Sequence, residues 1–125
     1  MEIKTFDGYQ KEAVALKISL NKFQKIFPNM SDDIIKLIDV TYDGLGLGEA
    51  GEVQGKIKKI IRDNGGIIDE ESKMGILLEI GDTLWYLASL CENLDTTLEH
   101  AATLNIEKLH TRQKNNTLHG NGDYR

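Results

Sequence analysis

Apolar positions recur at helical spacing over most of the chain. Between about residues 5 and 26, spacings of three and four place one set on a single helix face: Phe6, Tyr9, Ala13, Leu16, Leu20 and Phe23. An α-helix has 3.6 residues per turn, so this pattern predicts one amphipathic helix over that range. Pro28 interrupts it, and Ser31 before two aspartates supplies an N-cap for a second helical segment over residues 32–45.

The helical pattern continues over residues 42–63, although glycines interrupt it at positions 44, 46, 48, 51 and 55. Each glycine costs a helix about 0.5–1 kcal/mol relative to alanine, so this series predicts that another backbone or a ligand approaches that face closely. Gly65 and Gly66 then provide a helix stop. A long helix follows from Asp69 to about residue 93, with an apolar stripe made of Leu77, Ile80, Leu84, Leu87 and Leu90.

The last helix is predicted from a capping box in Thr96-Thr97-Leu98-Glu99, with Thr96 and Glu99 as the capping pair, to about residue 114. Residues 115–125 read as a C-terminal loop or tail. No alternating strand pattern, internal repeat or shift in composition interrupts the helices. The pattern therefore predicts an all-α fold with a single domain over residues 1–114, a helical bundle of four to five helices.

Composition and charge narrow the classes of partner. The 125 residues include 20 Asp and Glu against 15 Lys and Arg, a net charge of −5 that disfavours binding to nucleic acid and favours a metal cation. Cys91 is the single cysteine, so no intrachain disulfide can form, and a reducing, cytoplasmic setting is expected. The N-terminus lacks a targeting pattern, and no uninterrupted apolar run approaches the roughly 18–20 residues of a membrane helix, so no membrane partner is expected.

Two acidic pairs stand out on two of the predicted helices. Glu49 and Glu52 are three residues apart, which puts both carboxylates on one helix face about one turn apart, and Glu79 and Asp82 repeat that geometry on the next long helix. If the two helices pack antiparallel, the four carboxylates can meet inside the bundle.

Buried carboxylates that meet repel each other, and a divalent cation relieves that repulsion. Oxygen-only ligands of this kind suit Mg²⁺, with Mn²⁺ as an alternative. The competing interpretation is two solvated helix faces, because acids three residues apart are common on exposed helices. Gly51 and Gly81 inside the pairs, and the apolar surroundings in GILLEIGDTLWYL, favour the metal site.

Cationic and amide side chains accompany the acids. Lys56 follows Glu49 by seven residues and Lys59 follows Glu52 by seven, so each returns to nearly the same helix face. Singly, each lysine is more typical of a solvated surface. In the last predicted helix, spacings of three and four give a further stripe of donors: Asn105, Lys108 and Arg112. Carboxylates, a metal and cationic donors together are the equipment for binding a polyphosphate.

At these residues the chain resembles the MazG-type nucleoside triphosphate pyrophosphohydrolases of the all-α NTP pyrophosphatase superfamily. The resemblance covers most of the chain and rests on four motifs in register: GLGLGEAGEV, KKIIRDNGG, LLEIGDTLWYLA and NIEKLHTRQKNNTLHGNGDYR. It implies Mg²⁺-dependent hydrolysis of a nucleoside or deoxynucleoside triphosphate between the α and β phosphates, to a monophosphate and pyrophosphate. It also implies a homodimer, or a homotetramer built from dimers, in which two subunits complete the bundle.

Carried over position by position, the resemblance implies catalytic metal ligands at Glu49, Glu52, Glu79 and Asp82. Glu52 is our choice for the group that orients or deprotonates the attacking water. The family's N-x-x-K-L-x-x-R pattern is present, which implies contacts to phosphate or sugar, from the same or a neighbouring subunit, by Asn105, Lys108 and Arg112. Tyr86, one turn beyond Asp82, would line the nucleotide pocket.

Other interpretations remain open at this stage. A di-iron carboxylate bundle needs two Glu-x-x-His motifs, and the chain offers one, Glu107 to His110. A catalytically weak nucleotide-binding or helical interaction module, and a phosphoribosyl-ATP pyrophosphohydrolase, are the further alternatives. Trp85 is expected in the core more than in base stacking, and further candidates for base contacts are Phe6, Tyr9 and Gln10.

Overall fold

The computed structural model describes residues 2–17, 20–119 and 122, and within them it is helical, without a strand. In chain order the elements are α1 Phe6–Ala15, α2 Leu20–Ile26, α3 Asp32–Gly46, the 3-10 turn η1 Leu47–Glu49, α4 Ala50–Asp63, α5 Glu70–Asn93 and α6 Leu98–Lys114. The predicted all-α class is confirmed. The single domain over residues 1–114 stays a prediction, although α6 does end at Lys114.

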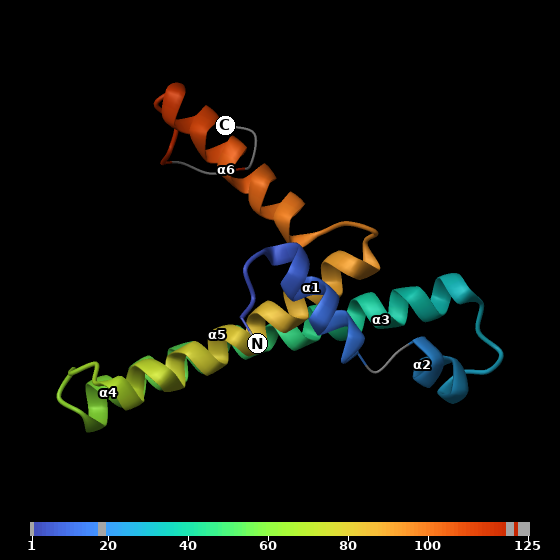
Figure 1. Ribbon diagram of the computed structural model, residues 1–125, viewed down its shortest axis with the longest axis horizontal. Helices are drawn as coiled ribbons and strands as arrows, with labels where there is room; N and C mark the ends of the chain where they lie inside the picture. Colours follow the sequence, from blue (N-terminus) through green and yellow to red (C-terminus); the bar gives the residue numbers. More distant parts are fainter. Residues whose placement is uncertain (1, 18–19, 120–121, 123–125) are drawn as a thin grey trace.

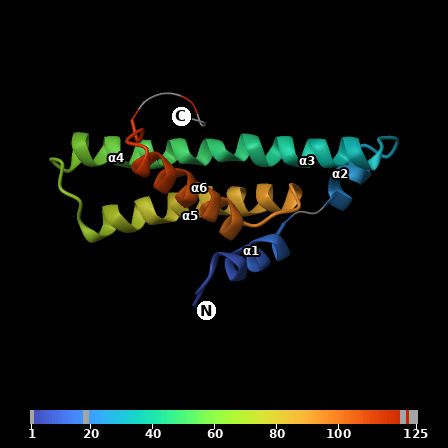
Figure 2. The ribbon, with the colours of Figure 1, turned by 90° about the horizontal axis from the view of Figure 1, so that it is seen from above.

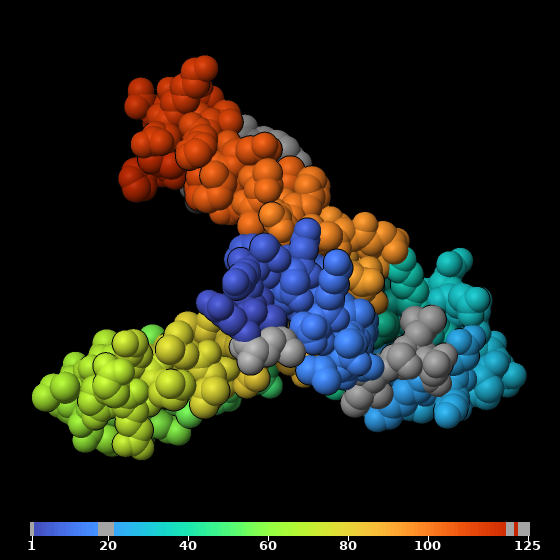
Figure 3. All heavy atoms as spheres, in the orientation of Figure 1, coloured from blue at the N-terminus to red at the C-terminus, as the bar shows by residue number. Residues whose placement is uncertain are grey.

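The long α5 is the centre of the arrangement. Helices α3 and α4, joined through η1, form a nearly straight rod, and α5 returns antiparallel along it (Figure 2). Helix α1 packs on α5 as well. By contrast, α6 touches α1 and α5 but projects away from the rod, which leaves an open notch between its far end and α4 (Figures 1 and 3). The antiparallel packing of α4 and α5 is the arrangement that the two acidic pairs require.

The single helix predicted over residues 5–26 is wrong, because the chain leaves the helix after Ala15 and resumes at Leu20. At the end of α1, Leu16 is 76% exposed instead of lying on an apolar face. Lys17 follows it, and its ammonium lies 2.7 Å from a carboxylate oxygen of the buried Asp39. A buried ion pair that takes Lys17 toward α3 therefore replaces the continuous helix.

The remaining helix ends largely follow the predicted signals. The Ser31 hydroxyl accepts a hydrogen bond from the Ile34 backbone N–H at the start of α3. Gly65 and Gly66 have φ values of 59° and 78°, the left-handed backbone that favours glycine after a helix. The Asp69 side chain caps α5 by accepting from the Ser72 N–H at 2.8 Å. Backbone groups at a helix end have no hydrogen-bond partner within the helix. Each of these residues either supplies such a partner or lets the chain turn away at that point.

The cap of α6 is Thr97, whose hydroxyl accepts from the His100 N–H, and not the predicted Thr96. The reason lies in α1. The Gln10 amide donates to the Thr96 carbonyl at 2.9 Å and accepts from the Leu98 N–H at 2.8 Å, so the helix begins one residue later than predicted. Gln10 is buried and ties α6 to α1, which leaves its amide engaged within the fold and removes it from the candidates for base contacts.

The predicted apolar stripe of α5 is only partly buried: Leu84, Leu87 and Leu90 are half-buried, and Leu87 packs against the core cluster. Leu77 and Ile80 are exposed, and the buried positions are Ala88, Ser89 and Asn93. The core cluster is accordingly small, formed by Ala13, Ala88 and Leu98. Among the described helices, α5 alone has the length and mean hydropathy, 1.3, of a candidate membrane span, a test that the core helix of a soluble protein also passes.

Candidate metal centre

Three of the four predicted ligand carboxylates come together where α5 passes the junction of η1 and α4. Glu49, Glu79 and Asp82 each offer a carboxylate oxygen, and these oxygens all lie within 4.8 Å of one another. Glu49 and Glu79 are half-buried and Asp82 is exposed. Three negative groups at this spacing repel one another, so the site favours a cation between them.

The local fold explains how these side chains meet. Glu49 is the last residue of η1, the 3-10 turn through which the rod passes from α3 to α4 and which packs on α5. Glu79 and Asp82 are one turn apart on α5 and share a face of that helix. The antiparallel course of α5 brings this face to the η1 turn.

Glu52, the fourth predicted ligand, is not part of this group of carboxylates. It lies in the first turn of α4, and its side chain is exposed. The glycines inside the pairs do not explain the position of the acids, because a Cβ added at Gly51 or Gly81 would meet nothing within 4 Å. The expected close approach at the glycine series occurs at another position, Gly46.

At Gly46 the ring of Tyr86 lies so close to the backbone that an added Cβ would overlap it. Tyr86 and Trp85 line a cavity of about 280 Å³ together with Glu49 and Asp82. Burial raises the pKa of the Tyr86 hydroxyl above its ordinary value, and Tyr42 and Glu49 act in the same direction. Tyr86 therefore lies at the same cavity as two of the carboxylates, and its predicted place in a nucleotide pocket stays a prediction.

Tyr9 links α1 to the same part of α5. Its hydroxyl donates to the Gly81 carbonyl at 3.4 Å, between the two α5 carboxylates. Burial raises the pKa of this hydroxyl, and the nearby charge of Asp82 raises it further. Phe6 is exposed and lines a separate cavity with Tyr9. Helix α1 therefore supports the acid-bearing turn of α5 from the side away from α4.

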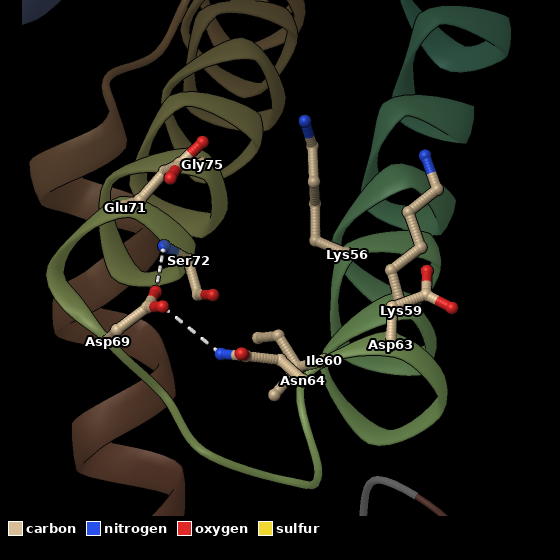
Figure 4. A pocket seen from close by; sticks show the side chains of 9 residues that line it. All are labelled: Lys56, Lys59, Ile60, Asp63, Asn64, Asp69, Glu71, Ser72 and Gly75. Atoms are coloured by element: carbon tan, nitrogen blue, oxygen red, sulfur yellow. Dashed lines mark hydrogen bonds between the residues drawn. The ribbon is translucent and has the colours of Figure 1, made fainter.

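Of the two α4 lysines predicted to bind phosphate, Lys56 and Lys59, Lys56 reaches the carboxylates. Its ammonium lies 3.3 Å from a carboxylate oxygen of Glu79. Lys56 and Lys59 line a groove of about 390 Å³ between α4 and α5, and both side chains extend away from the turn that joins these helices (Figure 4). The lining of this groove also includes Asp63, Asp69 and Glu71, so its charge is mixed.

The predicted donors of α6 lie elsewhere. Asn105 is exposed and Lys108 is half-buried. Arg112 is buried and donates to the Gly122 carbonyl at 3.1 Å, within the tail of its own chain. None of these residues lines the cavity beside Glu49 and Asp82. The structure therefore does not bring this predicted stripe to the carboxylates within one chain.

Sequence reasoning missed a buried polar cluster between α3, α5 and the end of α1. Lys17 lies 2.7 Å from Asp39 and 3.6 Å from Asp43, and it donates to Asn93 at 2.8 Å. Ser89 and Asn93 each donate to Asp43 at 2.7 Å. The signal was available, because Asp39 and Asp43 follow the buried Ile35 at steps of four residues and therefore share its inward face.

Comparison with known proteins agrees with this geometry. The family model described as the MazG nucleotide pyrophosphohydrolase domain matches residues 44–117, which include all the acidic residues of the site. Gene 37 protein of Mycobacterium phage L5 is 39% identical over 101 residues, covering 80% of this chain and 88% of the phage protein. No solved structure matches the chain. The chain belongs to the MazG nucleotide pyrophosphohydrolase family, and the resemblance inferred from its motifs is confirmed.

Proposed function

We propose that the protein hydrolyses a nucleoside or deoxynucleoside triphosphate between its α and β phosphates, with Mg²⁺, to a monophosphate and pyrophosphate. The observation that carries this proposal is the group of Glu49, Glu79 and Asp82, whose oxygens lie within 4.8 Å of one another beside a cavity walled by Tyr86. The group lies inside the region that matches the MazG domain, a family of nucleotide pyrophosphohydrolases.

The carboxylates fit the expected cation. All are oxygen donors, and Asp82 is exposed, so water or phosphate oxygens can complete the coordination. Such a donor set suits Mg²⁺, with Mn²⁺ as the alternative. A cation held there would supply charge neutralisation for the phosphates and orientation for the attacking water.

The other roles fall to side chains around this group. We assign to Glu52, one turn beyond Glu49 and exposed, the role of orienting or deprotonating the attacking water. Lys56 and Lys59, in the adjoining groove, are donors for the phosphates that leave as pyrophosphate. Tyr86, which lines the cavity beside Glu49 and Asp82, offers its hydroxyl as a donor at the nucleotide.

We further propose that a homodimer, alone or paired into a homotetramer, is the active form. Exposed apolar side chains on α4 and α5 support this, and they are Ile57, Ile61, Met74, Leu77, Leu78 and Ile80. Large apolar surfaces of this kind usually mark an interface. A neighbouring subunit is also the source from which α6 would bring Asn105 and Lys108 to the site, whereas Arg112 is buried and bonded to the tail of its own chain. Sedimentation under assay conditions tests this, and a monomer that retains full activity would contradict it.

One observation favours the alternative of a catalytically weak nucleotide-binding or interaction module. Glu52 lies outside the carboxylate group, so the predicted fourth ligand is not in place. The di-iron alternative gains no such support, since the carboxylate group found among the described residues contains no histidine. Phosphoribosyl-ATP remains an alternative substrate of the same metal chemistry.

The experiment is a screen of ribo- and deoxyribonucleoside triphosphates, together with phosphoribosyl-ATP, with and without Mg²⁺. Monophosphate and pyrophosphate are the expected products, formed only when Mg²⁺ is present. A nucleoside diphosphate and orthophosphate would place the cleavage at a different bond. No turnover of any substrate, with binding retained, would favour the nucleotide-binding module.

A further inference from the structure

The deeply buried positions of α3 and α5 are mostly polar. Beside the apolar Ile35 and Ala88, the two helices bury Asp39, Asp43, Ser89 and Asn93. Apolar contacts are non-directional, whereas hydrogen bonds form only over a narrow range of lengths and angles. The register of α3 against α5, meaning the position of one helix along the axis of the other, therefore depends on where these polar groups meet.

Asp43 joins the two helices. Its Oδ2 atom accepts a hydrogen bond from the Ser89 hydroxyl and another from the Asn93 amide, each at 2.7 Å. Ser89 and Asn93 are one helical turn apart on α5, so both bonds form together in one register only. Asp43 is 1% exposed, so water does not replace a bond that is broken there, and an unpaired buried carboxylate destabilises the fold.

The same register continues from Asp43 to the metal centre. One turn on from Asp43, Gly46 receives the ring of Tyr86. One turn further, Glu49 meets Asp82. Along α5 these contacts run in the opposite direction in steps of three or four residues, as expected of antiparallel helices. The hydrogen bonds at Asp43 and the carboxylates of the metal centre therefore depend on one register.

We propose that the Asp43 cluster, made of Asp43, Ser89 and Asn93, positions the carboxylates of the metal centre by fixing this register. Its members are positioning residues, because they lie outside the centre and act through the place of Glu49 along α5. A slip of one helical turn, about 5.4 Å, would exceed the 4.8 Å within which the oxygens of the three acids lie. The inference rests on the proposed function for the metal centre, but the register itself can be measured without a metal.

The energetics of buried polar groups separate this role from an ordinary structural one. Replacing both sides of a buried polar contact with apolar groups of the same shape is often neutral or stabilising. Buried polar side chains in helical assemblies can nevertheless specify the register, at a cost in stability. The Asp43 cluster should therefore matter more for metal affinity than for the free energy of unfolding.

The test removes the polar contacts between α3 and α5 and keeps their shape. A triple variant carries Asp43→Leu, Ser89→Ala and Asn93→Leu, in which leucine has the branched shape of aspartate and asparagine. Lys17 keeps its partner Asp39, 2.7 Å away, so no buried charge is left alone. We expect the helical content and the free energy of unfolding to be retained, while α3 and α5 no longer hold a single register.

Two measurements follow the register and its effect. In the metal-free protein, nuclear Overhauser contacts between the Gly46 α protons and the Tyr86 ring report the register, because the ring lies against this glycine. Calorimetric titration with Mn²⁺ reports the metal centre without nucleotide or turnover. In the triple variant we expect these contacts to weaken and the affinity for Mn²⁺ to fall about tenfold or more, as when residues that support metal ligands are changed.

An exposed ion pair supplies the matched control. Lys36 on α3 lies 2.8 Å from Asp95, which follows the end of α5, and both side chains are exposed. The double variant Lys36→Gln and Asp95→Asn removes this contact, and asparagine tolerates the φ of 56° at position 95. It should leave the Overhauser contacts and the affinity for Mn²⁺ unchanged. An equal loss in this control would overturn the specific role of the Asp43 cluster.

The remaining outcomes also decide the proposal. A folded triple variant with both measurements unchanged would overturn it, as would a change in one measurement without the other. Should the triple variant fail to fold, Ser89→Ala alone removes one bond to Asp43 and should weaken Mn²⁺ binding about threefold. Unchanged binding in Ser89→Ala would then contradict the proposal.

The wild type separates failure of this inference from failure of the proposed function. Wild-type protein that binds Mn²⁺ but hydrolyses no triphosphate, with the expected losses in the triple variant, would reject the hydrolase and support the positioning role. Hydrolysis by the wild type with unchanged Mn²⁺ affinity in the triple variant would support the hydrolase and reject the positioning role. Wild-type protein that binds no Mn²⁺ would reject both.

Discussion

The ammonium of Lys56 lies 3.3 Å from a carboxylate oxygen of Glu79, one of the three acids at the candidate metal centre. Lys56 therefore neutralises part of the negative charge that a divalent cation would neutralise when it binds. A divalent cation at this centre would compete with Lys56 for Glu79, and its binding would release the lysine toward substrate phosphates in the adjoining groove.

Replacing Lys56 should separate its competition with the metal from its role as a phosphate donor. In Lys56→Gln we expect Mg²⁺ or Mn²⁺ to bind up to about fivefold more tightly in the absence of nucleotide, since a partly exposed ion pair contributes at most about 1 kcal/mol. We expect kcat/KM for the triphosphate to fall at the same time, because a phosphate donor is lost. Calorimetric titration with the metal measures the first effect. Lys58→Gln, an exposed substitution on the same helix, is the control, and equal or weaker metal binding in Lys56→Gln would contradict competition.

The contact between Gly46 and Tyr86 leads to a second prediction. An alanine at position 46 would place its Cβ inside the Tyr86 ring, so Gly46→Ala should displace that ring and cost about 1–3 kcal/mol of unfolding free energy. Gly44→Ala is the matched control on the same helix, where an added Cβ meets nothing within 4 Å. It should stabilise the helix by about 0.5–1 kcal/mol. Urea unfolding measures both, and equal stability of the two variants would argue against the close contact.

The carboxyl group of Asp69 should account for part of the loss of folding stability at acid pH. Its hydrogen bonds from Ser72 lower the pKa of this carboxyl below its ordinary value. A lowered pKa in the folded state means that the stabilisation is present above the ordinary pKa and is lost as the pH falls through the lowered value. Asp69→Asn retains a capping acceptor without this titration, so its melting temperature should fall less steeply on acidification than that of the wild type. Parallel profiles of melting temperature against pH would exclude this contribution.

Helix type and many helix ends were predictable because they depend on local chemistry. The Ser31 and Asp69 caps and the stop at Gly65 each satisfy or redirect nearby backbone groups, and those signals lie within a few residues of the helix end. The end of the first helix after Ala15 was not predictable in this way, because it depends on the ion pair between Lys17 and Asp39, which lies on a different helix. The start of α6 likewise depends on Gln10, which is remote in sequence.

The candidate site was partly predictable for the same reason. Spacing alone placed Glu79 and Asp82 on one face, and antiparallel packing then brought Glu49 to them. Spacing treated Glu52 as equivalent to Glu49, but Glu49 ends a 3-10 turn and Glu52 lies in the first turn of the regular helix α4, so their side chains differ in surroundings. The cavity lined by Phe23, Tyr42, Trp85 and Tyr86 brings together segments that are distant in sequence, so it could be recognised only in the structure.

The most direct test of the central claim is the variant Glu79→Gln, assayed for Mg²⁺-dependent release of pyrophosphate from a triphosphate that the wild type hydrolyses. The amide removes a charged metal ligand while keeping the size of the side chain, so activity should be lost while the helical circular dichroism persists. Glu12→Gln, an exposed change on α1, should retain activity and serves as the control. Full activity in Glu79→Gln would contradict the assignment of the metal centre.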